Sequence, residues 1–257
     1  MNARQSATFL PNYSDVCLSA ILYHKDAIGS RQELRLFPLA LRAFCGVCAT
    51  IPGMDVQDFS SVLARLRSGL LPIERGDSLV DEVEGEHSQA RKAAVLLALF
   101  VQDGETHLAF IRRASTLRAH SGEIAFPGGS YESEDKSLVA TALREAFEEI
   151  GLLPARVEVL GLLSPVFTVV SNFLIMPVVA YLPSGPGQLL IQASEVAEIL
   201  LLPLQGLADP VIAHTEVWTR ENQARTVYFY DYGPLRIWGA TARILNNLLD
   251  LLHDTSG

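Results

Sequence analysis

Residues 128–152, GGSYESEDKSLVATALREAFEEIGL, are the stretch from which both a fold and a function can be predicted. The second half, Leu138–Ile150, contains no Gly or Pro and predicts a helix. Gly151 follows it directly, and glycine readily adopts the left-handed conformation that ends helices. We therefore expect one well-defined helix here, preceded by a loop.

Three glutamates lie on this predicted helix. Glu145, Glu148 and Glu149 are spaced i, i+3 and i+4, so their carboxylates share one face. Like charges on one turn repel by a few tenths of a kcal/mol per exposed pair, and a bound cation would relieve that repulsion. Mg²⁺ is typically held by carboxylates together with water and substrate phosphates. The alternative is a solvated acidic face, because Glu is a good helix former on any surface.

The residues that precede the helix favour a ligand site. Gly128 and Gly129 follow an apolar stretch, and glycine lets the backbone turn tightly and approach a ligand closely. An acid-rich loop then leads into the helix. Arg144, beside the glutamates, faces partly away from them and can pair with an acid on that loop.

The run 144–152, REAFEEIGL, resembles the second half of the Nudix box, REUxEExGU, in which U is aliphatic. The first half of that box is a Gly, five residues and a Glu. Here five residues after Gly129 lead to Asp135, and one extra residue separates Asp135 from Arg144. Whether Glu134 or Asp135 orients Arg144 therefore stays open.

The resemblance implies a fold and a site. The fold is α+β, an α/β/α sandwich with a mixed central sheet. The site is catalytic, with Arg144 in an orienting role and Mg²⁺ or Mn²⁺ held by the helical glutamates Glu145, Glu148 and Glu149.

Composition narrows the functional classes. The chain has 257 residues, is 49% hydrophobic and carries a net charge of −9, which argues against general nucleic-acid binding. Its three Cys all fall within the first 48 residues and suit a reducing compartment. No secretory signal peptide is evident, so we expect a cytoplasmic protein. The uncharged segment 162–182 contains Pro165 and Pro177 and predicts two strands around a loop at 168–172, not a membrane span.

The chain divides into three parts. Residues 1–53 are an N-terminal extension of uncertain role, and their Cys45-x-x-Cys48 is weak support for zinc or redox chemistry. Residues 54–90 predict a helix (56–66) and an acidic linker loop (71–87), and residues 91–257 form the predicted Nudix hydrolase domain. Its expected strands are 93–101, 106–111, 124–126, 157–163, 175–181 and 226–232, and its last helix is 238–252. Strands around two helices without a βαβ repeat favour the α+β class.

A basic segment precedes the glycines. Arg112, Arg113, Arg118 and His120 all come before the first acid, Glu123. A guanidinium group can donate two parallel hydrogen bonds to two oxygens of one phosphate, and it stays charged at every relevant pH. We expect a local phosphate-binding patch; the alternative is an ordinary basic loop that pairs with the acidic linker.

Residues 112–129, with Leu117-Arg118-x-His120-x-Gly122 leading to Phe126-Pro127-Gly128-Gly129, are similar to the motif upstream of the Nudix box in coenzyme A pyrophosphatases. Further similarity at 165–168, 176–179 and 237–245 extends the resemblance over 91–252. It implies a small-molecule nucleotide substrate, coenzyme A or an acyl derivative, cut at its pyrophosphate into 3′,5′-ADP and (acyl-)4′-phosphopantetheine. The expected substrate contacts are Arg112, Arg113, Arg118, His120, Gly128 and Gly129.

Several alternatives remain open at this point. The general base is Glu149, Glu195 or Glu198. The substrate of another Nudix hydrolase, such as ADP-ribose, and a non-catalytic nucleotide-binding module are competing functions. A homodimer is also left open.

Overall fold

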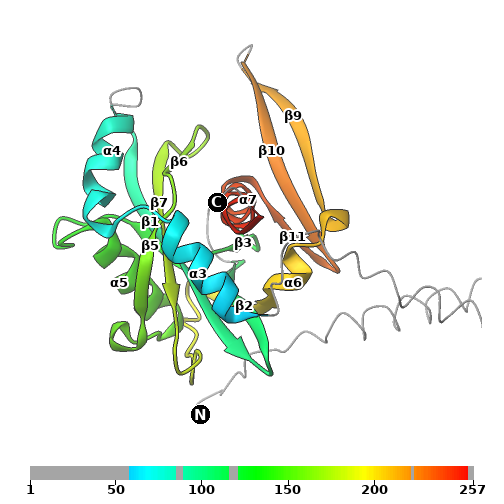
Figure 1. The fold of residues 1–257 in the computed structure, drawn as a ribbon. Coiled ribbons are helices and arrows are strands. Elements are labelled where there is room, and N and C mark those ends of the chain that lie inside the picture. The colour runs from blue at the N-terminus through cyan, green and yellow to red at the C-terminus, as the bar shows by residue number, and fades with distance from the viewer. Residues whose placement is uncertain (1–57, 85–88, 116–120, 221–222, 254–257) are drawn as a thin grey trace, which may run out of the picture.

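The main sheet forms the middle layer of a sandwich. In the computed structural model, residues 58–84, 89–115, 121–220 and 223–253 are described. Helix α5 (Leu138–Ile150) covers one face of an eight-stranded sheet, and α3 (Phe59–Gly69) and α7 (Gly239–His253) cover the other (Figure 1). The predicted α+β fold with an α/β/α sandwich is therefore confirmed.

The sheet is mixed, with β1 (Arg91–Gln102) at its centre. Strand β1 runs parallel to β7 (Phe173–Tyr181) and antiparallel to β2 (Glu105–Arg113). Both faces of β1 are covered, which explains its continuous apolar sequence. The remaining strands are β3 (Ile124–Ala125), β4 (Gly128–Ser130), β5 (Glu158–Leu162), β6 (Val166–Thr168) and β8 (Val196–Pro203).

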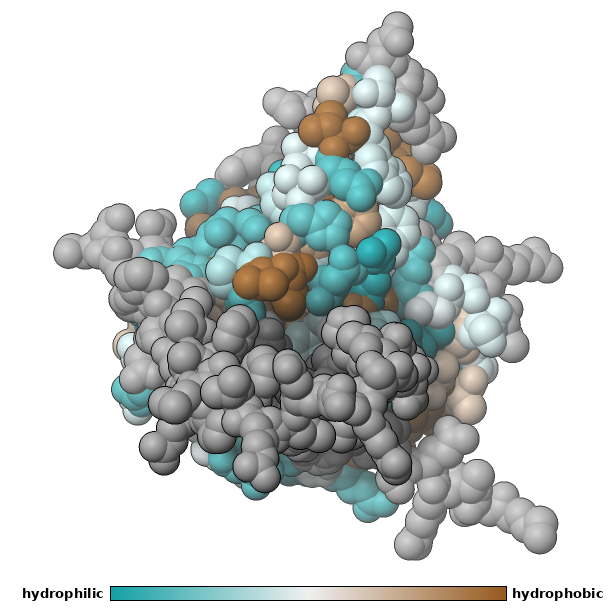
Figure 2. All heavy atoms as spheres, turned by 90° about the vertical axis from the view of Figure 1, so that its right-hand side faces the viewer, coloured by the Kyte–Doolittle hydropathy of each residue, from teal (hydrophilic) through white to brown (hydrophobic). Residues whose placement is uncertain are grey.

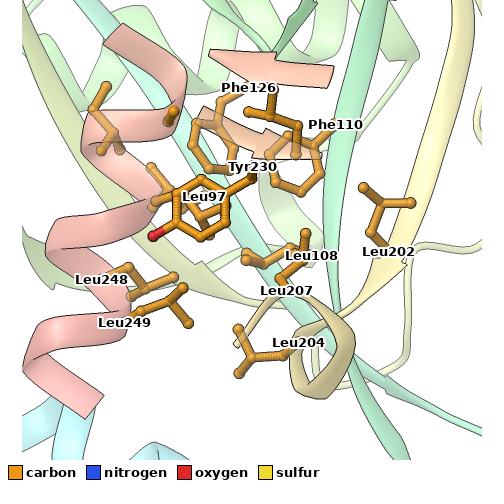
Figure 3. Close-up of a cluster of buried hydrophobic side chains, with 14 of the residues drawn as sticks. Leu97, Leu108, Phe110, Phe126, Leu202, Leu204, Leu207, Tyr230, Leu248 and Leu249 are labelled. Atoms are coloured by element: carbon orange, nitrogen blue, oxygen red, sulfur yellow. The ribbon is translucent and has the colours of Figure 1, made fainter. Parts of the chain in front are cut away.

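Strand alternation divides the core into two layers. Even-numbered residues of β1 face α5, and odd-numbered ones face α7. In the layer on the α7 face, Tyr230 packs near Phe110 and Leu97, and its hydroxyl donates to Asn246 Oδ1 at 3.2 Å (Figure 3). Full burial of one such leucine or phenylalanine contributes about 1.5–3 kcal/mol. The packing thus fixes which side of each strand faces which helix.

Helix α5 begins and ends where its sequence predicts. The Ser137 hydroxyl accepts a hydrogen bond from the Ala140 N–H at 3.2 Å and caps the first turn. Gly151 has φ of 68° and closes the last turn. Leu138, Ala142 and Ala146 are buried against the sheet, which leaves the glutamate face toward β4.

A second, three-stranded sheet of β9 (Ala213–Arg220), β10 (Gln223–Tyr232) and β11 (Leu235–Trp238) packs against α7. The sequence predicted only its middle strand. Short helices complete the described part of the chain: η1 (Ile73–Arg75), α4 (Gly76–Glu84), η2 (Pro154–Arg156), α6 (Leu204–Leu207) and η3 (Pro210–Ile212).

The predicted loop at 71–87 was wrong, because η1 and α4 occupy most of it. Val80 is fully buried beneath the α5 face of the sheet, and this burial outweighs the polar local sequence. The helix expected at 56–66 runs instead from Phe59 to Gly69 and is capped by Asp58, whose carboxylate accepts from Ser60 N–H at 3.0 Å.

The apolar segment 162–182 contributes β6 and β7, as predicted. Among the described helices, none combines the length and apolar character required to cross a bilayer. Residues 1–53, with Cys45 and Cys48, lie outside the described residues.

Candidate functional site

Arg144 joins the loop before α5 to the helix. Its guanidinium donates to both Asp135 oxygens, from Nε at 2.9 Å and from Nη2 at 3.0 Å. Arg144 Nη1 lies 3.1 Å from both Glu145 Oε1 and Glu148 Oε2. Of the two loop acids left open by the sequence, Asp135 is therefore the one that pairs with Arg144.

Asp135 is held by more than Arg144. Its Oδ2 also accepts from Thr141 Oγ1 at 2.9 Å and from Glu132 N–H at 3.0 Å. The Arg144 hydrogen bond is the main reason that the pKa of Asp135 falls to about 2. Thr141, fully buried on α5, was not predicted to take part. Its position three residues before Arg144, on the same helix side, is the sequence signal that would have identified it.

Glu149 is buried, with 1% of its surface exposed. Its Oε2 accepts from the Gly128 N–H at 2.9 Å, and its Oε1 lies 3.9 Å from Arg113 Nη1. Burial raises the pKa of Glu149 to about 8, although the Gly128 bond and the Arg113 charge act in the opposite direction. Burial therefore favours the protonated form of this carboxyl group.

The two glycines have separate structural roles. A Cβ added at Gly128 would meet the Ala94 carbonyl oxygen and would lie 2.6 Å from Val95 Cα, so the backbones of β4 and β1 leave no room for it. A Cβ added at Gly129 would lie 2.5 Å from the Glu145 carboxyl group. Gly128 thus allows strand pairing and the bond to Glu149, and Gly129 leaves space for Glu145.

Glu145 and Glu195 extend the acidic region. Burial raises the pKa of Glu145, and the negative charge of Glu195 raises the pKa of both Glu145 and Glu149. Backbone hydrogen bonds fix the Glu195 segment: Gln192 N–H donates to Glu149 O at 2.9 Å, and Ala114 N–H donates to Glu195 O at 2.8 Å. The segment before β8 therefore lies beside the end of α5.

Arg112 and Arg113 lie on opposite faces of the main sheet, because β2 continues through both. Arg112, on the α7 face, donates from Nε to Glu198 Oε2 at 3.0 Å. Arg113, on the α5 face, approaches Glu149, and its buried Nε has no hydrogen-bond partner among the described residues. Arg118 and His120 lie outside the described residues.

Comparison with known proteins identifies the family of this chain. The NUDIX domain profile matches residues 90–221, slightly more than half of the chain. The chain belongs to the Nudix family. The matched range includes all three helical glutamates, Arg144 and both glycines.

Two bacterial relatives carry the name "uncharacterized Nudix hydrolase NudL". The protein from Photorhabdus laumondii is 42% identical over 158 residues, which cover 62% of this chain and 83% of that protein. The one from Pectobacterium atrosepticum is 38% identical over 170 residues, or 65% of this chain and 85% of that protein. Among solved structures, a Nudix hydrolase from Alicyclobacillus acidocaldarius is similar with a TM-score of 0.42 and 19% identity, over 63% of this chain and 92% of that one.

The three glutamates of the Nudix-family site carry carboxylate oxygens, which are the ligands that hard divalent ions prefer. Arg144 holds Glu145 and Glu148, whereas Gly128 holds Glu149. Within the described residues, no three His, Cys, Asp or Glu side chains are gathered into a metal-ligand group. The three glutamates thus lie on one helix turn, each already engaged by a neighbour.

Proposed function

We propose that this Nudix-family protein is a metal-dependent hydrolase of the pyrophosphate bond in coenzyme A or acyl-coenzyme A. The main support is the direct contact between two sequence features. The segment 112–129, which resembles the coenzyme A pyrophosphatase motif, carries Gly128 and Arg113, and both reach Glu149 of the Nudix helix. The products would be 3′,5′-ADP and (acyl-)4′-phosphopantetheine.

Glu145, Glu148 and Glu149 would hold Mg²⁺ or Mn²⁺. When bound, the ion would neutralise phosphate charge and make water a stronger nucleophile. A bound cation would favour the ionised form of Glu149, whose pKa is raised by burial in the absence of such a cation. Arg144 orients Glu145 and Glu148 and thereby acts as a positioning residue.

Arg113 is the proposed phosphate contact within the described residues. Its guanidinium lies on the α5 face beside Glu149, and 29% of its side chain is exposed, so the charge can meet a substrate phosphate. Arg118 and His120 are proposed as further contacts from the sequence resemblance. We assign Arg112 a structural role instead, because Glu198 already pairs with it on the other face.

The general base is proposed to be Glu195. It is exposed, and no described residue forms a hydrogen bond or ion pair with its carboxylate. Glu198 is engaged by Arg112, and Glu149 by Gly128. A water O–H proton would pass to Glu195 while the water oxygen bonds to phosphorus. The bridging P–O bond breaks, and its electron pair leaves with the departing phosphate.

The net charge of −9 argues against nucleic acid as the partner, and the cysteine content supports the cytoplasm as the proposed location. ADP-ribose, or another nucleoside diphosphate derivative, is the nearest alternative substrate. A non-catalytic nucleotide-binding module is the alternative class.

The test is product analysis after incubation with coenzyme A and Mg²⁺. Release of 3′,5′-ADP, with a higher kcat/KM than for ADP-ribose at equal Mg²⁺, is the expected result. Preference for ADP-ribose would contradict the substrate assignment. Equally poor turnover of every diphosphate by wild type and Glu149→Gln would indicate the non-catalytic module.

A further inference from the structure

Strands β9 and β10 form a ribbon that projects from the body of the molecule (Figure 1). Residues 213–219 of β9 and 223–226 of β10 are exposed, so both faces of the outer ribbon meet solvent. An isolated two-stranded ribbon is marginally stable in water. The outer half of this ribbon therefore lacks the packing that stabilises its inner half against α7.

One long edge of the ribbon is free in the described part of the chain. Strand β9 pairs only with β10 there, and its register shows no bulge. It contains no Pro or Lys, which natural edge strands use to prevent pairing. At its centre, Val217 is 70% exposed and Trp218 is 47% exposed. Figure 2 shows this side of the molecule, where hydrophobic surface lies among hydrophilic residues on the projecting part.

We propose that β9 pairs antiparallel with β9 of a second copy of this chain. A twofold axis joins two identical edges in this way and leaves no free edge between the two sheets. The two three-stranded sheets would become one continuous six-stranded sheet. Such an assembly does not depend on the hydrolase activity.

The sequence of β9 complements itself when Val217 faces Val217 of the second copy. Thr215 then lies opposite the partner's Thr219, and Glu216 opposite the partner's Trp218. Threonine pairs and apolar pairs stabilise antiparallel strands when they lie directly opposite each other.

Glu216 and Trp218 share a face of β9, and within one chain the Trp218 indole N–H donates to Glu216 Oε2 at 2.7 Å. The register centred on Val217 therefore places each Glu216 opposite a Trp218 of the second copy and keeps the two Glu216 carboxylates from lying directly opposite each other. Moving the register by two residues in one direction would place Glu216 opposite Glu216, and like charges directly opposite each other are destabilising. Electrostatics therefore favours the register centred on Val217 over that one.

The pairing would also place two aromatic surfaces on one face of the joined sheet. Trp218, Phe229 and Trp238 line a hollow of about 240 Å³ in each copy, with Glu216 and Arg236 beside them. Opposite residues of an antiparallel pair share a face, so both hollows would open on the same side.

The first experiment measures the mass of the full chain by sedimentation equilibrium. We expect wild type to form a dimer, and Val217→Lys to have the monomer mass of 28.0 kDa with an unchanged circular dichroism spectrum. Val211→Lys is the matched control, because Val211 is 84% exposed but lies in η3, before β9, and this variant should remain dimeric. A monomeric wild type, expected if residues 1–57 or another protein cover β9, would overturn the proposal. So would a Val217→Lys variant that remains dimeric.

The second experiment tests the register by oxidative cross-linking of the full chain. Cys17, Cys45 and Cys48 are first replaced by Ser, and Val217→Cys is added. Opposite Cα atoms in antiparallel strands lie about 4.5–5.5 Å apart, within the range that a disulfide spans. Val217→Cys should give a covalent dimer, whereas Val211→Cys should not. Equal cross-linking of both variants, or of neither, would overturn the proposed interface.

Discussion

Two neighbouring arginines, one on each face of the main sheet, differ in how closely they pair with a carboxylate. On the α7 face, Arg112 and Glu198 form an ion pair at 3.0 Å, with 32% and 27% of their side chains exposed. On the α5 face, Arg113 lies 3.9 Å from a Glu149 side chain that is 2% exposed, and the Arg113 Nε has no described partner. One face therefore pairs its arginine closely with a carboxylate, whereas on the other face Arg113 and the buried Glu149 are paired only loosely.

This difference follows from burial and geometry. A buried donor without an acceptor costs about 1–3 kcal/mol, and the Arg113 Nε on the α5 face is such a donor among the described residues. Glu149 cannot be fully neutralised by Arg113 at 3.9 Å, and burial raises its pKa to about 8. The loose ion pair and the buried acid both lie on the α5 face. The Arg112–Glu198 pair on the α7 face has neither feature.

The largest expected effect comes from exchanging one arginine at a time. Arg113→Ala should lower kcat/KM for coenzyme A about a hundredfold, because a charged donor to the substrate is lost. Arg112→Ala should lower it by less than about threefold and act mainly on stability. Steady-state kinetics of both variants at saturating Mg²⁺ measure the contrast, and a larger loss in Arg112→Ala would reverse the assignment of the faces.

On the α5 face, substitutions at Gly128 and Gly129 should separate an effect on stability from an effect on activity. Gly128→Ala places its methyl group against the backbone of β1 and should destabilise the protein by about 1–3 kcal/mol. Gly129→Ala meets the end of the Glu145 side chain, which can move, so its melting temperature should change little.

The displaced Glu145 should nevertheless reduce kcat about tenfold in Gly129→Ala. Thermal unfolding and steady-state kinetics of the two variants provide the measurement. A Gly129→Ala variant with wild-type kcat would show that the position of Glu145 is unimportant.

A smaller effect is expected on the pH dependence of stability. The pKa of Glu149 rises from 4.5 to about 8 on folding, so the folded state keeps a proton that the unfolded state loses between these values. Stability should therefore fall as pH rises through this window. Glu149→Gln, measured with EDTA, should gain at least about 1 kcal/mol over wild type at pH 8.5 relative to pH 4.5.

The matched change on the α7 face, Glu198→Gln, should not stabilise the protein, because Arg112 loses its charged partner. Denaturant unfolding of both variants at the two pH values provides the comparison. If the free energies of unfolding of Glu149→Gln and wild type differed by the same amount at both pH values, burial would not raise the pKa of Glu149.

Local sequence was sufficient to predict α5 and its end at Gly151, since capping and helix propensity act over a few residues. It could not choose between Glu134 and Asp135 as the partner of Arg144, because two adjacent loop acids differ only in how the loop folds. Helix α4 was missed because the burial of Val80 depends on the sheet.

The separation of Arg112 from Arg113 was missed for a simpler reason. The predicted strand ended at Ile111, which placed both arginines in a loop, whereas β2 continues through Arg113 and its alternation turns them to opposite faces. Strand β9 was missed because residues 213–219 are exposed on both faces and show no apolar alternation.

Binding of Mn²⁺, followed by electron paramagnetic resonance without substrate, tests the metal role of the α5 face most directly. The account predicts that Glu149→Gln binds Mn²⁺ at least about tenfold more weakly than wild type, whereas Glu198→Gln binds it equally well. Equal binding by Glu149→Gln and wild type, or a loss confined to Glu198→Gln, would contradict it.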